Sequence, residues 1–284
     1  MVESIKIDAH QHFWQISRED YDWMTDDVEN IRHDILPSDL SPLIDLHDIT
    51  GTVVVQAAAT VAETEFLIGL AEKTNFIKGL VGWVDLTDAD TPQTLDRLMQ
   101  STAFKGVRPM LQDIEDTKWI SQPKVMANLA ALAERGLRLD ALVQPRHLGV
   151  LVQVAKELPE LAIVIDHCAK PVIADGADAG TAWRDGMARL AELPNVVCKI
   201  SGLANESGPG WSAERLQPVI DHVLRQFGAE RVMWGSDWPV LNLVGDYARW
   251  RAVSAQLLQG CSDQDRAEIY GGTAVKFYGL EFDE

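Results

Sequence analysis

Short apolar runs alternate with longer amphipathic segments along most of the chain, and this alternation predicts βαβ units. Eight runs of strand length, rich in β-branched residues, span residues 5–10, 52–57, 79–85, 104–109, 137–143, 162–167, 196–201 and 231–237. Each run is apolar on both faces, as parallel strands that are covered by helices must be.

The segments between these runs have the apolar periodicity of helices, and most of them begin beside Pro, Thr or Ser. The clearest helices are expected at residues 61–74, 91–102, 123–136, 146–158 and 213–228. Two stretches, 13–38 and 202–212, fit neither helix nor strand. Both follow the C-terminal end of an expected strand, where barrel enzymes place their substrate loops.

This pattern predicts an α/β fold with one domain over residues 1–284, a single (β/α)₈ TIM barrel whose active site lies at the C-terminal ends of the strands. The length of 284 residues suits such a barrel, which typically needs about 250. An open doubly wound sheet is the alternative. That fold would usually carry a glycine-rich phosphate turn after its first strand, whereas the first run here leads into His10-Gln11-His12.

Charge and cysteine content narrow the classes of partner. The chain has 25 basic and 43 acidic residues, a formal net charge of −18, which argues against nucleic acid and anionic membranes as partners. The cysteines Cys168, Cys198 and Cys261 form no CxxC pair. With no signal-peptide pattern and no apolar stretch of about 20 residues, we expect a cytoplasmic protein.

Histidines and one aspartate occupy the expected strand ends. His10 and His12 are two residues apart, so in an extended chain both imidazoles point to one side and can converge on one ion. Independent hydrogen bonds in a turn are the alternative. His167 ends the sixth run and Asp237 the eighth, and a closed barrel delivers all four side chains to the same rim. His167 could instead fill the core, and Asp237 could cap a helix.

Five segments, in their order, carry a resemblance to a known family. They are IDAHQHFW (7–14), FKGVRPMLQ (104–112), IDHCAKP (165–171), CKISGL (198–203) and RVMWGSDWPV (231–240). With them the chain resembles the amidohydrolase superfamily, in particular its branch of L-fuconolactonases and related sugar lactonases. The resemblance implies that His10 and His12 are metal ligands of the first strand. It also implies that His167 is the sixth-strand histidine and that Asp237 activates water.

The chain departs from the fuller superfamily pattern at two strands. Binuclear members end the fourth strand with a carboxylated Lys or a Glu and the fifth with a His, but here these runs end in Arg108-Pro109 and Val143-Gln144. We therefore expect at most one divalent ion, zinc, held by His10, His12, His167 and Asp237. Some lactonases of this branch work without metal, so the ion is not assumed to be essential. Lys105 is expected to point outward or to form a structural pair, and not to be carboxylated.

Further candidates lie near the same rim. Arg108 is a candidate for stabilising an oxyanion, with a salt bridge on the rim as its alternative. The candidates for contact with substrate are Trp14, Arg108, His147, Lys170, Lys199 and Trp238. The tryptophans could stack on a sugar ring or pack in the core, the lysines could bind hydroxyls or form ordinary ion pairs, and His147 could face substrate or solvent.

These residues lead to three functional hypotheses. In the first, Asp237 activates water, with or without one metal ion, and the water opens an aldonolactone. Examples of the lactone are L-fuconolactone, L-rhamnonolactone and L-galactonolactone. His167 orients the water or assists proton transfer. In the second, the barrel is a metal-dependent decarboxylase of an aromatic or β-keto acid, as in another branch of the superfamily. In the third, it binds sugar acids without catalysis, which the retention of Asp237 argues against.

Overall fold

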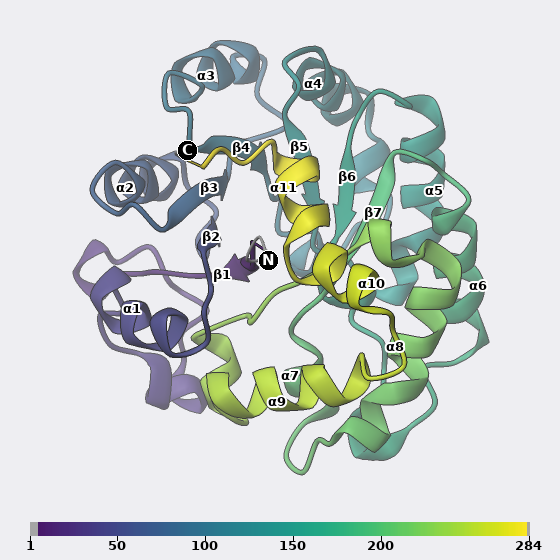
Figure 1. The fold of residues 1–284 in the computed structure, drawn as a ribbon. Coiled ribbons are helices and arrows are strands. Elements are labelled where there is room, and N and C mark those ends of the chain that lie inside the picture. The colour runs from purple at the N-terminus through teal and green to yellow at the C-terminus, as the bar shows by residue number, and fades with distance from the viewer. Residues whose placement is uncertain (1–4, 283–284) are drawn as a thin grey trace.

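The computed structural model describes residues 5–282, and in it eight parallel strands form a barrel in the order of the sequence (Figure 1). The strands are β1 (Ile7–Gln11), β2 (Gly51–Val55), β3 (Ile77–Gly82), β4 (Phe104–Val107), β5 (Arg138–Ala141), β6 (Ile163–Ile165), β7 (Val196–Ile200) and β8 (Val232–Trp234). Each expected run overlaps one strand, and the predicted (β/α)₈ barrel is confirmed.

The barrel closes where the chain leaves β8 and meets the end of β1. Gln11 pairs with Trp238 in a parallel bridge. Two backbone hydrogen bonds flank it, from Asp237 N to the carbonyl of His10 (2.8 Å) and from His12 N to the carbonyl of Trp238 (2.8 Å). The closing contacts therefore bring His10, His12 and Asp237 together.

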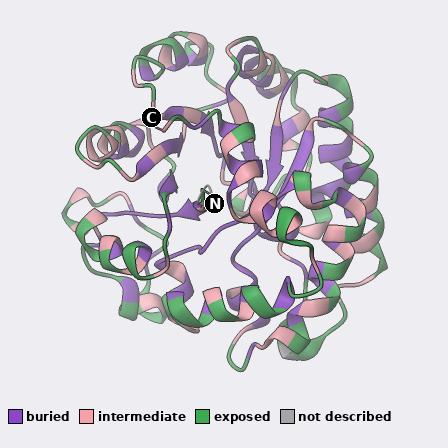
Figure 2. Cartoon of the chain, in the orientation of Figure 1, coloured by how far each residue is buried: buried purple, intermediate pink, exposed green. Residues whose placement is uncertain are grey.

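Helices follow the strands and surround the barrel, with their exposed faces outward (Figure 2). They are α1 (Pro37–Leu46), α2 (Val61–Ala71), α3 (Thr91–Leu98), α4 (Pro123–Glu134), α5 (Leu148–Glu157), α6 (Thr181–Ala191), α7 (Leu203–Ser207), α8 (Ala213–Phe227), α9 (Tyr247–Leu257), α10 (Asp263–Ala267) and α11 (Thr273–Tyr278). The five helices named from the sequence are α2, α3, α4, α5 and α8. The stretch 202–212, expected to be irregular, contains the short helix α7, because one helical turn follows Gly202 at the end of β7.

The C-terminal helix α11 closes the N-terminal end of the barrel, in front of the strands in Figure 1. Its Ala274 and Tyr278, together with Leu280, pack against inward side chains of the strands, including Val53, Val164 and Met233. This inner cluster is separate from the larger apolar core between strands and helices. With one end filled by apolar side chains, the polar residues of the interior lie toward the other end.

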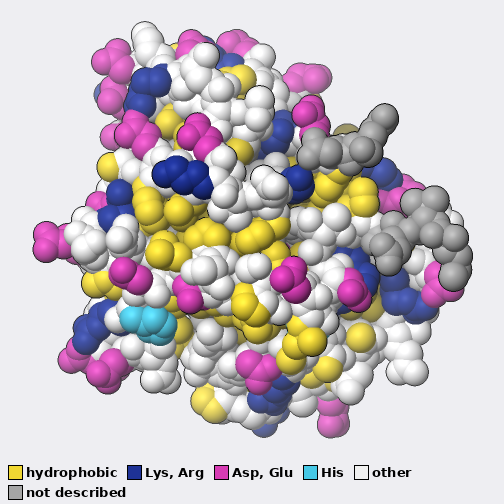
Figure 3. Space-filling view, turned by 60° about the vertical axis from the view of Figure 1, so that its left-hand side comes forward, with side chains coloured by type: hydrophobic (Ala, Val, Ile, Leu, Met, Phe, Trp, Pro, Cys, Tyr) yellow, Lys and Arg dark blue, Asp and Glu magenta, His cyan; other side chains and the backbone are white. Residues whose placement is uncertain are grey.

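The surface agrees with the charge balance of the sequence. On the face shown in Figure 3, acidic and basic side chains are interspersed and form no continuous basic stripe. None of the helices within residues 5–282 combines the length and the apolar character that are needed to cross a membrane.

Candidate active site

Three imidazoles surround one carboxylate at the C-terminal ends of the strands. Oδ1 of Asp237 lies 3.3 Å from Nε2 of His12, 3.7 Å from Nε2 of His10 and 3.8 Å from Nε2 of His167. All four side chains are almost fully buried. The four residues that the sequence placed on one rim thus lie within contact distance of a common point.

Each imidazole is oriented through its other nitrogen. Nδ1 of His12 donates to the carbonyl of Val55 at 2.7 Å, and Nδ1 of His167 lies 2.9 Å from the hydroxyl of Ser201. Nδ1 of His10 lies 3.3 Å from Oδ1 of Asp166. A partner on one ring nitrogen fixes the ring and directs the other nitrogen inward, as is usual for histidines that bind metals.

His167 sits on an unusual turn after β6. Residues 167–170 all have positive φ, between 48° and 61°, although none is glycine. Each such residue costs roughly 1–2 kcal/mol, so the surrounding structure must hold the turn. Nε1 of Trp183 donates to the carbonyl of Cys168 at 2.7 Å, and Lys170 N donates to the carbonyl of His167 at 2.9 Å. The turn directs both His167 and Lys170 to the same cavity.

Burial sets the protonation states of the cluster. It lowers the pKa of His10 well below the usual value and also lowers the pKa of His167, so both rings are neutral at neutral pH. Burial alone would raise the pKa of Asp237, but His167, His12 and His10 around the carboxylate outweigh it and bring that pKa below its usual range. Neutral imidazoles beside an ionised carboxylate are the forms that bind metal.

The cluster fits a divalent cation. Because a carbonyl can only accept, His12 carries its proton on Nδ1, and the lone pair on Nε2 faces the carboxylate of Asp237; two acceptors at 3.3 Å require a cation or a shared proton between them. His10, His12 and Asp237 offer ligand atoms that lie within 4.8 Å of one another.

Buried charge gives the same result. Three buried carboxylates, those of Asp140, Asp166 and Asp237, lie near two buried cations, Arg108 and Lys199, which leaves an excess of negative charge.

The fourth and fifth strands add no further ligands. Among residues 5–282 the one group of three or more candidate ligands is His10, His12 and Asp237. Lys105, on β4, points away from the site as expected, and its Nζ donates to the carbonyl of Gly279 at 3.1 Å. The geometry therefore suits one ion rather than two.

A cavity of about 270 Å³ opens beside this cluster. His12, His167 and Asp237 contribute to its wall, together with the predicted residues Trp14, Arg108 and Lys170. Trp23, an aromatic residue of the expected rim loop 13–38, also lines it, whereas the sequence did not single out the other polar and large apolar residues, Met110, Gln112, Asp113, Leu142 and Val240. These side chains come from loops and strand ends, and the alternation of apolar runs gives no signal for them.

Arg108 lies inside the cavity wall and not on an exposed rim. It is 4% exposed, its Nη2 donates to the carbonyl of Gln56, and its Nη1 lies 3.4 Å from Nε2 of His10. Nε of Arg108 is buried without a hydrogen-bond partner. The ion pair that Arg108 makes is buried and does not lie on an exposed rim, because its Nη1 lies 3.9 Å from Oδ2 of Asp166, a residue without exposed surface.

Three expected substrate contacts are not part of the cavity wall. Lys199 has no exposed surface and lies inside the barrel, because it faces inward one layer below Ser201. His147 is buried at the start of α5, where its Nδ1 accepts from Gln144 N at 3.1 Å. Trp238 packs edge-on against Phe13 at 6.3 Å between ring centroids. This contact corresponds to the alternative in which the tryptophan packs in the core.

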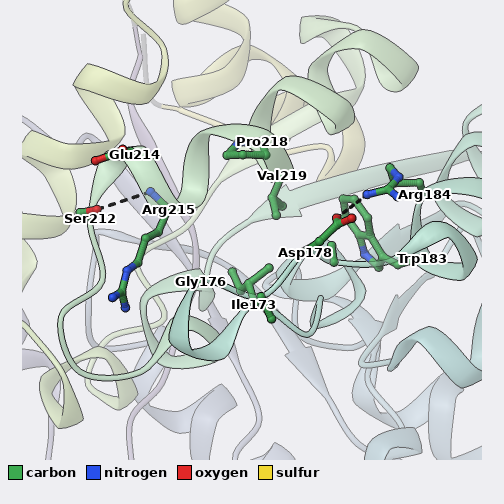
Figure 4. Close-up of a pocket in the computed structure, with 12 residues that line it drawn as sticks. Ile173, Gly176, Asp178, Trp183, Arg184, Ser212, Glu214, Arg215, Pro218 and Val219 are labelled. Carbon is green, nitrogen blue, oxygen red and sulfur yellow. Dashed lines mark hydrogen bonds and ion pairs between the residues drawn. The ribbon is translucent and has the colours of Figure 1, made fainter.

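A larger cavity of about 540 Å³ lies elsewhere, between the loop before α6 and the start of α8 (Figure 4). Ile173, Trp183 and Val219 line it, and Arg184 pairs with Asp178 at its edge. None of the described residues that line it belongs to the histidine cluster. Size alone therefore does not identify the active site, and the smaller cavity carries the chemistry.

The whole described barrel is similar to known proteins. Residues 7–280 match the model of a family described as amidohydrolase. An L-fucono-1,5-lactonase of Burkholderia ambifaria is 43% identical over 282 residues, 98% of this chain and 97% of that protein. An L-fucono-1,5-lactonase of Burkholderia multivorans is 33% identical over 289 residues, with the same coverage of 98% and 97%. The crystal structure of an amidohydrolase from Burkholderia multivorans with bound zinc has a TM-score of 0.92 at 32% identity, covering 98% of this chain and 100% of that one.

Proposed function

Because the chain belongs to the amidohydrolase family, we propose that it is a lactonase, which hydrolyses a sugar lactone to the aldonic acid. The observation that carries the proposal is the carboxylate of Asp237, which is buried among three imidazoles at the wall of a cavity of small-molecule size. The two Burkholderia relatives, both named for L-fucono-1,5-lactone, support L-fuconolactone as the first substrate to test, with L-rhamnonolactone and L-galactonolactone next.

Asp237 is the general base of the proposed reaction. It accepts a proton from water, and the water oxygen forms a bond to the lactone carbonyl carbon. The carbonyl oxygen becomes an oxyanion, and the guanidinium of Arg108 at the same wall stabilises it. When the tetrahedral centre collapses, the bond to the ring oxygen breaks and that oxygen takes a proton. His167 lies 3.8 Å from Asp237 and is placed to pass the proton on.

The same residues would hold one divalent ion, which we propose to be zinc. His10, His12 and Asp237 supply its ligands, with His167 beside them. When bound, the ion supplies Lewis-acid polarisation and makes water more acidic. Support comes from the ring orientations, from the excess of buried negative charge beside the histidines and from zinc in the related crystal structure.

Other residues of the cavity suit a sugar ring. Trp23 offers an exposed apolar face for the carbon face of a sugar, and the fully buried Trp14 packs against it edge to face at 5.7 Å between ring centroids. Lys170, Gln112 and Asp113 supply donors and acceptors for hydroxyls. Lys170 also pairs with Glu206 at 2.8 Å, so its ammonium is held in place at the cavity.

We also propose that the protein is cytoplasmic. Cys168, Cys198 and Cys261 are all free, which supports a cytoplasmic location where thiols stay reduced.

A panel of aldonolactones tests the function. Purified protein is mixed with each lactone and a pH indicator, before and after chelation, and with β-keto and aromatic acids while carbon dioxide is measured. We expect acid release from at least one 6-deoxy-sugar lactone and no carbon dioxide. Carbon dioxide without acid release would favour the decarboxylase, and binding without turnover would favour the binding protein.

A further inference from the structure

A second polar cluster lies inside the barrel beneath the three histidines. Its centre is Lys199, on β7, which has no exposed surface. Nζ of Lys199 lies 2.5 Å from Oδ2 of Asp140, 3.1 Å from Oδ1 of Asp166 and 3.2 Å from Nδ1 of His10. An isolated buried ammonium would be very costly, so two carboxylates accompany it.

The cluster continues to the helix that fills the opposite end of the barrel. The hydroxyl of Tyr278, on α11, donates to the same Oδ2 of Asp140 at 2.7 Å. Nζ of Lys199 also lies 5.5 Å from the centre of the Tyr278 ring. A continuous series of buried contacts therefore runs from α11 through Asp140, Lys199 and Asp166 to His10.

The hydrogen-bonding capacity of these groups decides how His10 is protonated. Nδ1 of His10 can donate to Asp166, at 3.3 Å, or accept from Lys199, at 3.2 Å. If it accepted, the ring proton would be on Nε2 and would face Nη1 of Arg108 at 3.4 Å, so two donors would oppose each other. If it donates to Asp166, the Nε2 lone pair is free to face Arg108 or a cation.

We propose that Lys199 is a positioning residue, which fixes Asp166 together with Asp140 and Tyr278 and so holds His10 with its Nε2 lone pair toward the metal-binding group. The inference rests on the proposed function, but it concerns the affinity for zinc and not the identity of the lactone. Lys199 does not line the cavity, so it does not contact substrate. Its removal should therefore weaken zinc binding and leave KM almost unchanged.

Zinc affinity is the readout, measured on the apoprotein by competition with a chromophoric chelator and without lactone. Partners behind a ligating histidine typically change metal affinity by about 10- to 100-fold, and we expect a rise of that size in the zinc Kd of Lys199→Met. At saturating zinc, the KM of Lys199→Met should stay within about twofold of the wild-type KM, because Lys199 makes no contact with the substrate. Lys105→Met, which removes a lysine whose Nζ donates to the carbonyl of Gly279 after α11, is the matched control and should not change the zinc Kd.

A second variant separates positioning from loss of the fold, because Lys199→Met leaves two buried carboxylates without their cation. Tyr278→Phe removes one hydroxyl from α11 and should raise the zinc Kd in the same direction but by less. Unchanged zinc affinity in Tyr278→Phe and in folded Lys199→Met would overturn the inference, as would a wild-type protein that binds no zinc. Lactone hydrolysis without zinc would still leave the proposed function standing.

Discussion

Nε2 of His12 lies 3.3 Å from Oδ1 of Asp237, while Nδ1 of the same ring donates to the carbonyl of Val55. The two facing atoms are both acceptors in the neutral ring and the ionised carboxylate. A proton or a cation must lie between them. The same pair of atoms can therefore share a proton or bind a metal ion.

Replacement of the carboxylate tests the general base. Asp237→Asn keeps the shape and the backbone hydrogen bond to His10, but the amide cannot accept a proton from water. We expect kcat to fall by about 10² to 10⁴, the usual contribution of a positioned base, with an unchanged circular dichroism spectrum. Asp113→Asn, at the exposed edge of the same cavity, is the control and should affect KM more than kcat. Turnover near the wild-type rate in Asp237→Asn would remove this residue from the mechanism.

Metal content is the second prediction. Elemental analysis of the purified protein should find at most one divalent ion per chain, because β4 and β5 end without further ligands in the described chain. His12→Gln should lower that content, since an amide is a weaker ligand than imidazole. Two ions per chain, about 3.5–4 Å apart in a crystal structure, would contradict the assignment.

Arg108 should act on the transition state more than on substrate binding. The guanidinium meets a partial negative charge on the lactone carbonyl and a nearly full one on the tetrahedral oxyanion. Removal of one oxyanion donor costs about 10² to 10³ in kcat in other hydrolases, and we expect a loss of that size for Arg108→Met with little change in KM. Arg108→Lys should recover part of it, because a point charge cannot reproduce the planar fork. A raised KM with kcat unchanged would make Arg108 a simple binding contact.

Glu63, on α2, gives a prediction about stability and pH. Its side chain is fully buried and accepts from the backbone N–H groups of Ala57 (3.1 Å) and Ala58 (2.7 Å), and burial raises its pKa from 4.5 to about 7. Between these values the unfolded chain has lost the proton and the native state keeps it. The free energy of unfolding should therefore decrease as pH rises from 4.5 to about 7.

Glu63→Gln cannot ionise and isolates this contribution. Urea unfolding of both proteins, at about pH 4 and about pH 8, should show the wild type losing about 3 kcal/mol relative to the variant as pH rises, because a tenfold difference in proton affinity between the folded and unfolded chains corresponds to about 1.4 kcal/mol. A difference between the two proteins that stays constant with pH would show that Glu63 has an ordinary pKa in the native state.

The sequence was sufficient for the barrel and for the meeting of four residues, since parallel strands place their C-terminal ends on one rim. The sequence could not predict how deep inside the barrel a given side chain lies. Lys199 and Ser201 are two residues apart and both point inward, yet Ser201 contacts His167 and Lys199 lies one layer deeper, beside Asp140. The stagger between neighbouring strands sets that depth, and it cannot be read from one strand alone.

Two further features of the site depend on tertiary structure. The positive φ values of residues 167–170 have no signal in the sequence, because none of these residues is glycine and the turn is held from outside by Trp183. Gln112 and Asp113 line the cavity because the loop after β4 folds toward it, and apolar periodicity does not specify the path of a loop.

Hydrolysis of L-fucono-1,5-lactone in water enriched with oxygen-18, followed by mass spectrometry of the product, tests the central claim most directly. Water activated by Asp237 attacks the carbonyl carbon, so the account predicts one labelled oxygen per aldonic acid, in its carboxylate, at a rate that falls by about 10² to 10⁴ in Asp237→Asn. Label in a hydroxyl group of the product, or labelling of the carboxylate by Asp237→Asn at close to the wild-type rate, would contradict it.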